Sequence, residues 1–362
     1  MQRKTRRRWF GRLTAAAGAL LLFCLPLDWS RLGSTLTLAA ASIGQPQNTA
    51  ALLQQRLQRP VTHVDSGDTG SYGEALPFAP TGGDHTAPDV DSLPVTAPVT
   101  VPAEDGSGGK IYERTLDPGD THSHPVAVRN RSQTAVNVEE ALQTALTPLA
   151  DTAEPQVLII HTHTTEGYMT YDAGYYNAAD RQRTKEHGRN VCAVGEAVAA
   201  TLRQAGVNVL HDTTVHDSPQ YTGAYTRSAQ TVQGYLEKYP SIRVVLDLHR
   251  DAVMEGDTGL IKPTATVNGK KAAQMMILVG VTDTAALPHP HWKQNLALAV
   301  QWQKALTDRE PTLMRPLNTV ASRYNQHLSP GYLLVEVGSE GNTVAEAVYS
   351  GQLLGKTLAE IL

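Results

Sequence analysis

Two stretches of the chain bring together residue types that can hold a metal ion. Residues 161–166 (HTHTTE) follow an apolar run, and residues 247–251 (DLHRD) follow another. Imidazole nitrogens and carboxylate oxygens are common zinc ligands in proteins. A third apolar run, residues 333–337, contains the single carboxylate Glu336. Together the three runs predict a zinc hydrolase, in which imidazoles hold the ion and an acid or base lies beside the water that the ion activates.

The predicted imidazole ligands are His163 and His249. Two aspartates, Asp247 and Asp251, bracket His249, and a ligating imidazole normally gives its other ring N–H to a carboxylate or carbonyl. His161 is two residues before His163, so in an extended chain both face the same side. We assign His163 to the metal because it lies further beyond the strand. We expect His161 either to orient His163 or to contact substrate, and we prefer the second prediction.

The third protein ligand is harder to place. A catalytic zinc site takes three protein ligands and keeps a fourth position open. His187 directly precedes a predicted helix and is the expected third ligand, with Glu186 as its substitute. Glu166 is near enough in sequence to be a ligand, an acid that orients one, or a general base. Of these roles we predict a catalytic one for Glu166.

Two further charged residues have predicted catalytic roles. A carboxylate inside an apolar run costs several kcal/mol unless it is paired or neutralised. Desolvation raises the pKa of such a group towards the range useful for proton transfer, so Glu336 is the predicted acid/base. Arg250 is expected to bind a substrate carboxylate bidentately, with a structural ion pair as the alternative. The tyrosine-rich loop that begins at Tyr168 either walls the substrate groove or is pinned to its own domain.

Apolar runs alternate with amphipathic segments along the second half of the chain. This alternation predicts an α/β fold with a mostly parallel, doubly wound sheet flanked by helices. Ligands of such sheets bind at the carboxyl ends of the strands, where the candidate residues lie. Strands are expected at 126–128, 157–160, 207–210, 244–248, 275–281 and 332–337, and helices at 136–149, 190–205, before Pro240, 294–306 and 343–362.

The rest of the composition limits where the protein works. With 31 basic and 35 acidic residues, the chain shows no nucleic-acid footprint, and its two cysteines exclude a cysteine-rich zinc site. Basic residues concentrate in 3–12, before an uncharged stretch at 13–27. This pattern indicates a single-pass membrane anchor, or else a cleaved signal, with the remainder outside the cytoplasm. We predict a basic stub and anchor at 1–29, a disordered low-complexity linker at 30–109, and a catalytic domain at 110–362.

Four segments resemble the stage II sporulation protein P family of endospore-forming bacteria. They are residues 161–168, 247–252, 324–326 (YNQ) and 333–338. The resemblance extends from about residue 126 to the C-terminus. The family is related to zinc-dependent N-acetylmuramoyl-L-alanine amidases, whose site groups follow the order histidine, glutamate, histidine, catalytic glutamate.

The resemblance implies a peptidoglycan hydrolase that acts at the sporulation septum during engulfment. It implies amidase and endopeptidase activity, and partnership with stage II sporulation proteins D and M. Asn325, in one of the matching segments, is an expected substrate contact, together with Tyr168 and His161. The rival interpretations are a catalytically silent wall-binding scaffold and another zinc hydrolase, such as a deacetylase or carboxypeptidase.

Overall fold

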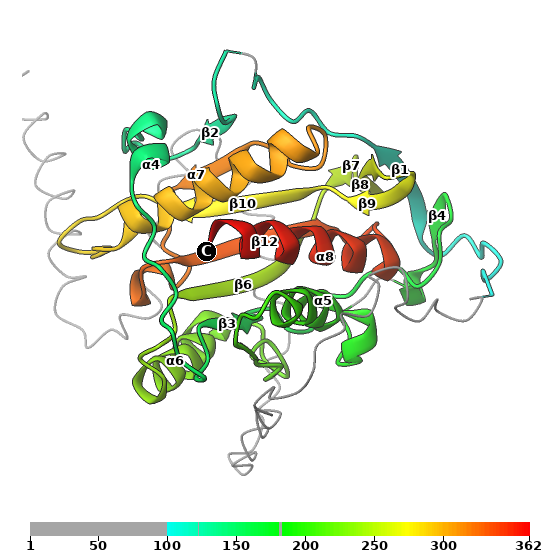
Figure 1. Cartoon of the computed structure of the whole chain (residues 1–362). Coiled ribbons are helices and arrows are strands. Elements are labelled where there is room, and N and C mark those ends of the chain that lie inside the picture. The colour runs from blue at the N-terminus through cyan, green and yellow to red at the C-terminus, as the bar shows by residue number, and fades with distance from the viewer. Residues whose placement is uncertain (1–99, 122, 181–182) are drawn as a thin grey trace, which may run out of the picture. The chain divides into compact units, whose positions relative to one another are not determined.

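The computed structural model describes residues 100–121, 123–180 and 183–362. Over these residues the chain forms two β-sheets and five α-helices (Figure 1). The predicted anchor at 1–29 and most of the predicted linker lie outside the described residues. Within the described part, no helix has both the length and the apolar character needed to cross a membrane.

The larger sheet carries the candidate residues. Its seven strands are, in spatial order, β2 (Val128–Asn130), β11 (Leu317–Val320), β10 (Met275–Gly280), β12 (Tyr332–Ser339), β6 (Val244–Asp251), β3 (Val157–Ile160) and β5 (Val209–His211). Neighbouring strands are parallel except at β10–β12. The α/β class is confirmed, but the sheet is mixed. The carboxyl ends of β3, β6 and β12 therefore share one edge with the amino ends of β10 and β11.

A smaller sheet was missed by the sequence analysis. It consists of β4 (Tyr175–Tyr176), β1 (Gly109–Arg114), β8 (Gly259–Val267), β7 (Met254–Glu255) and β9 (Lys270–Ala273). Its central strand β8 is almost wholly buried although it contains Lys262. The Lys262 Nζ lies 3.1 Å from Glu113, 2.6 Å from Asp172 and 2.8 Å from Glu346. Burial of this charge is tolerated because carboxylates surround it.

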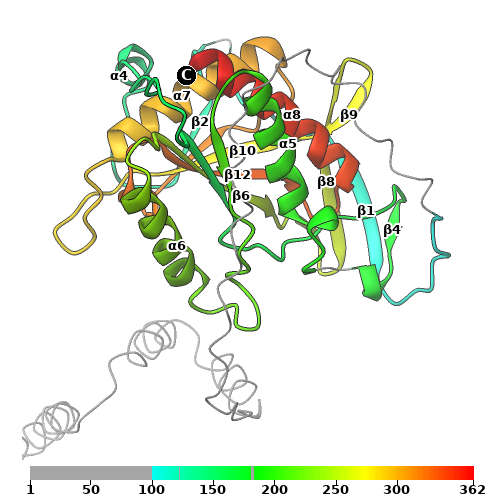
Figure 2. The ribbon, with the colours of Figure 1, turned by 60° about the horizontal axis from the view of Figure 1, so that its bottom comes forward.

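Helices cover both faces of the larger sheet. The α-helices are α4 (Val138–Gln143), α5 (Val191–Gln204), α6 (Ala224–Lys238), α7 (Trp292–Arg309) and α8 (Val344–Ile361), and 3₁₀ turns occur at Ala178–Asp180, His187–Arg189 and Gln326–Leu328. Helices α5, α7 and α8 lie over one face, and α6 lies on the opposite side (Figure 2). Alternate residues of β3 divide accordingly, with Ile159 in the α5/α7/α8 core and Ile160 in the α6 core.

Local sequence signals explain where the helices begin and end. The Asn190 side chain caps α5 by accepting a hydrogen bond from Cys192 N. A reciprocal capping box between Thr343 and Glu346 starts α8. The helix predicted at 136–149 is shorter than expected and ends at Gln143, because Thr144 is extended.

Candidate metal centre

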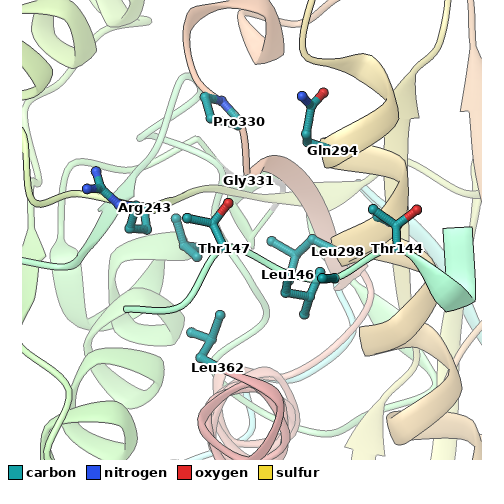
Figure 3. Close-up of a pocket in the computed structure, with 12 residues that line it drawn as sticks. Thr144, Leu146, Thr147, Arg243, Gln294, Leu298, Pro330, Gly331 and Leu362 are labelled. Atoms are coloured by element: carbon teal, nitrogen blue, oxygen red, sulfur yellow. The ribbon is translucent and has the colours of Figure 1, made fainter. Parts of the chain in front are cut away.

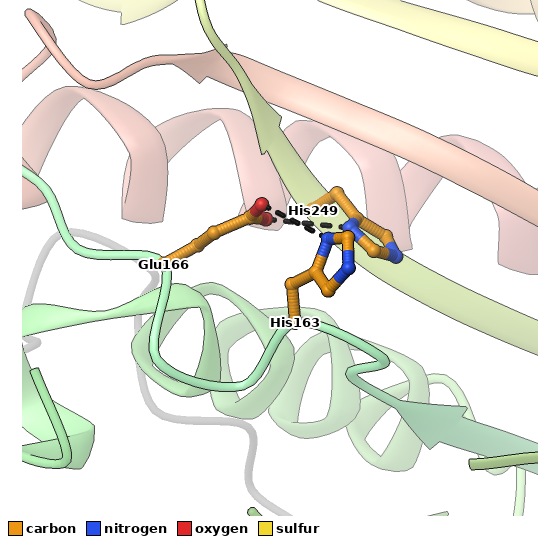
Figure 4. Close-up of side chains that lie close together, drawn as sticks. All are labelled: His163, Glu166 and His249. Atoms are coloured by element: carbon orange, nitrogen blue, oxygen red, sulfur yellow. Dashed lines mark ion pairs between the residues drawn. The ribbon is translucent and has the colours of Figure 1, made fainter. Parts of the chain in front are cut away.

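The structure brings His163, Glu166 and His249 together at the carboxyl ends of β3 and β6. Each offers one ligand atom, and these three atoms lie within 4.8 Å of one another. The Glu166 carboxylate bridges the two rings, 3.2 Å from His163 Nδ1 and 3.3 Å from His249 Nδ1 (Figure 4). The chain turns tightly after Ile160, and a 3.0 Å hydrogen bond from Glu166 N to His163 O closes the turn. The side chains of His163 and Glu166 therefore both point at His249.

The charges around the group suit a cation. Burial alone would raise the pKa of Glu166, but His249, His163 and Arg250 outweigh it and hold that pKa below its usual value. Burial opposes the charged form of His249, yet Asp247 and Glu166 outweigh it and raise the His249 pKa well above normal. The surroundings therefore stabilise positive charge at this point. Two imidazoles and one carboxylate also form a known donor set for catalytic zinc, so the residues fit the ion.

Asp247 holds His249 from behind. Its Oδ1 lies 2.9 Å from His249 Nε2, which leaves Nδ1 facing Glu166. The Asp247 carboxylate is fully buried and accepts bonds from Thr162 N (2.7 Å) and Thr162 Oγ1 (2.6 Å). Of the two bracketing aspartates, Asp251 instead pairs with Arg315 at 2.9 Å.

Glu336 lies on β12, in register with His249 on the neighbouring strand β6. Its Oε2 is buried and has no hydrogen-bond partner among the described residues. Burial raises the pKa of Glu336 to about 8, with Asp251 and Glu166 adding to the shift and His249 and Arg315 opposing it. A carboxyl group with this pKa beside a metal ligand is suited to proton transfer near neutral pH.

Three tyrosines that were not among the predicted site residues surround the group. Tyr221 is 53% exposed and stacks on His163 with the ring centroids 4.6 Å apart. Tyr225 meets His163 edge-on at 5.4 Å and lies nearly parallel to His249 at 6.4 Å. Tyr324 packs on Tyr225 at 5.6 Å. They come from separate loops and the start of α6, and no spacing in the sequence links them to the ligands.

His161 does not reach the substrate side of the sheet, which corrects its predicted role. The side chain is fully buried, with Nδ1 3.0 Å from Leu248 O and Nε2 3.0 Å from His211 Nε2. The chain turns after Ile160, so His161 and His163 do not share a face. Burial, with His211 adding, lowers the pKa of His161 to about 3, and the neutral ring serves to hold the Leu248 carbonyl next to His249.

His187 is not part of the group either. It is exposed in the 3₁₀ turn at His187–Arg189, and its neighbour Glu186 is exposed and lies 3.2 Å from Arg189. The carboxylate of Glu166 occupies the place expected for the third ligand. The order His163, Glu166, His249, Glu336 agrees with the family order of histidine, glutamate, histidine and glutamate, but its second member is Glu166 and not a residue near His187, where we expected the third ligand.

Arg250 and Tyr168 are engaged inside the protein rather than at the substrate side. The Arg250 Nε donates to Gly167 O at 2.6 Å and its Nη2 lies 3.4 Å from Glu340, so the structural alternative describes it better than a catalytic role. Its backbone N–H donates to Glu166 Oε2 at 3.1 Å and fixes that carboxylate. Tyr168 is buried and donates to Val337 O at 2.9 Å, so this part of the loop is pinned to the domain.

Asn325 lies near the centre but points at the protein. Its Nδ2 donates to Tyr225 O at 2.7 Å and to Ser228 Oγ at 3.1 Å. Ser228 Oγ in turn lies 2.7 Å from Thr162 Oγ1, which contacts Asp247. The predicted substrate contact is thus a residue that positions Tyr225.

A pocket lies at the opposite edge of the larger sheet (Figure 3). Its lining includes Val244 and Gly331, which are at the amino ends of β6 and β12, together with Leu146, Leu298 and Leu362. The candidate metal ligands are at the carboxyl ends of the strands. The pocket is therefore separate from the candidate centre.

No match is found among curated proteins. Three solved amidases resemble the structure: N-acetylmuramoyl-L-alanine amidase AmiC2 of Nostoc punctiforme (13% identity, 57% of this chain and 94% of that chain, TM-score 0.33), Ami1 of Mycobacterium abscessus (11%, 57% and 97%, 0.31) and an N-acetylmuramoyl-L-alanine amidase of Clostridium difficile 630 (14%, 57% and 94%, 0.33).

The sequence match to a family model is more extensive than the structural likenesses. The model of stage II sporulation protein P matches residues 111–359, which is well over half of the chain and includes all four site groups. The match begins within β1, so the smaller sheet is included as well. This chain belongs to the stage II sporulation protein P family.

Proposed function

We propose that the protein is a zinc-dependent peptidoglycan hydrolase that removes stem peptides from muramic acid in the septal wall during sporulation. The observation that carries the proposal is the convergence of His163, Glu166 and His249, with Glu336 beside them on the next strand. Membership of the sporulation family supports the wall as substrate. Cleavage of peptide cross-links is a second activity that the same centre would support.

The chain's own residues supply the proton transfers of amide hydrolysis. A zinc ion held by the three ligands would lower the pKa of a bound water to about 7 and polarise the scissile carbonyl. Glu336 takes the proton of the attacking water and passes it to the departing amine. Asp247 keeps the His249 ring in position, and His161 holds the backbone carbonyl of the preceding residue, Leu248.

The N-terminal pattern supports a location at the cell membrane. In this proposal residues 1–29 anchor the chain by a single span, residues 30–109 provide reach, and the catalytic domain works outside the cytoplasm. Stage II sporulation proteins D and M are the proposed partners, on the basis of the family resemblance. Separating the membrane fraction with and without alkaline extraction, and blotting for the chain, tests the anchor.

The test of activity is digestion of purified peptidoglycan by the zinc-loaded, full-length protein, with the products identified by mass spectrometry. Free stem peptides indicate an amidase, and cut cross-links indicate an endopeptidase. His249→Ala should lose both zinc and activity, whereas Glu336→Gln should keep zinc and lose turnover. An unchanged wall would favour a scaffold, and full activity in either variant would contradict the assigned centre.

A further inference from the structure

We propose that the Tyr225 hydroxyl donates a hydrogen bond to the carbonyl oxygen of the scissile amide as that oxygen becomes negatively charged. The inference deepens the proposed hydrolase function and rests on it. It assigns a catalytic residue that lies outside the ligand set and Glu336.

The Tyr225 ring lies against both imidazole ligands. It is in the first turn of α6, where it meets His163 edge-on and lies within 13° of parallel to His249. Its side chain is only partly buried, unlike those of His249 and Asp247. A tyrosine in this position borders the space that a substrate must enter to reach the ligands.

The hydroxyl is available as a donor. Among the described residues it has no hydrogen-bond partner, and it is not a buried unpaired atom. A tyrosine hydroxyl ordinarily loses its proton only near pH 10. An O–H group of this kind stabilises an oxyanion without giving up its proton.

The residue is held rigidly from the loop before the Gln326–Leu328 turn. Asn325 donates to Tyr225 O at 2.7 Å, and the Tyr324 ring packs on the Tyr225 ring. Both Tyr324 and Asn325 have left-handed backbone angles, with φ of 48° and 62°. Such angles are unfavourable for residues other than glycine and persist at sites where the surrounding contacts require them. Here the contacts in question fix the position of Tyr225.

The bond changes assign each group one task. A water oxygen bonds to the carbonyl carbon, the proton it loses goes to Glu336, and the C=O π pair moves onto the carbonyl oxygen. Tyr225 donates its hydrogen bond to that oxygen throughout and transfers no proton. When the carbonyl re-forms, the C–N bond breaks and the proton on Glu336 passes to the departing nitrogen.

The test is Tyr225→Phe in the full-length, zinc-loaded protein, which keeps the ring and removes only the hydroxyl. With a soluble muramoyl peptide we expect kcat to fall about 10²–10³-fold, the effect of losing one oxyanion donor, while KM, zinc content and Tm stay close to wild type. The matched control is Tyr239→Phe, at the far end of the same helix, which should behave as wild type.

A binding measurement separates a catalytic hydroxyl from a structural one. A phosphinic acid analogue, with tetrahedral phosphorus in place of the scissile carbon, should bind Tyr225→Phe at least ten-fold more weakly, while the cleaved stem peptide binds equally well. Wild-type kcat and analogue affinity in Tyr225→Phe would overturn the inference and leave the hydrolase function intact. An inactive wild-type enzyme would instead refute the proposed function, and this inference with it.

Discussion

Replacing Asp247 with asparagine tests how the ligand set is held. The two aspartates around His249 look equivalent in sequence, but only Asp247 faces the ring, with Oδ1 2.9 Å from Nε2. Asparagine keeps the shape of the side chain and removes the charge: its amide oxygen still accepts from Thr162 N, and its NH2 group would donate to Thr162 Oγ1, which can turn its own proton to Ser228 Oγ. Loss of such an outer contact typically weakens metal affinity 10–100-fold. We therefore expect Asp247→Asn to lose about 1.4–2.7 kcal/mol of zinc binding.

The assay is competition for zinc with a chromogenic chelator at pH 8.5, with Asp251→Asn as control. Asp251 pairs with Arg315, so its replacement should change the zinc affinity by less than about two-fold. The difference in zinc affinity between wild type and Asp247→Asn should become smaller towards pH 6. The Asp247 carboxylate also raises the pKa of His249, so in wild type a proton competes more strongly with zinc for this ring at low pH. Equal losses in the two variants, or wild-type affinity in Asp247→Asn at pH 8.5, would refute the reasoning.

Three further changes have defined outcomes. In zinc-free protein, the Tm of Glu336→Gln should rise relative to that of wild type as the pH increases from 5 to 8. Glu336 keeps its proton up to a pKa of about 8 in the folded protein but loses it at the lower, ordinary pKa of a glutamate in the unfolded chain, so wild type loses stability over this range. A constant Tm difference would contradict the raised pKa. His187→Ala should leave zinc content and peptidoglycan digestion unchanged, since the side chain is exposed and outside the ligand group; loss of zinc would restore it as a ligand. Gly195→Ala would place a methyl group 2.5 Å from His211 Nε2 and 2.8 Å from His161 Nε2. Overpacking of this kind lowers the free energy of unfolding by about 1–3 kcal/mol, so calorimetry should show a lower Tm. An unchanged Tm would show that the two rings can move apart.

The sequence predicted the larger sheet well because its strands are continuous apolar runs that end in polar clusters. Buried strands of this kind occur where helices cover both faces. The smaller sheet escaped notice because β8 interrupts its apolar residues with Lys262 and Pro263. Only the partners Glu113, Asp172 and Glu346, distant in sequence, make burial of that lysine tolerable. Charge pairing across such separations leaves no local pattern.

Within the candidate site, residues that follow buried strands were easier to predict than residues in turns. His249 and Glu336 are fixed by strand register, and the sequence identified both. Glu166, and not His187, joins the ligand group because of the turn after Ile160. Backbone hydrogen bonds set the direction of that turn, and residue types in the sequence do not reveal them. The same turn separates His161 from His163, although strand alternation predicted that the two would face the same way.

The three tyrosines around the candidate centre and the metal ligands come from different parts of the fold. Tyr221, Tyr225 and Tyr324 come from the segment that leads into α6, its first turn and a distant loop, whereas the ligands come from strand ends and one short turn. Substitutions of exposed residues there, such as Tyr221, can therefore change the surface beside the ligands without disturbing the coordinating atoms. In the proposed hydrolase, the range of accepted wall fragments is thus free to diverge while Tyr225 and the ligands keep the chemistry constant.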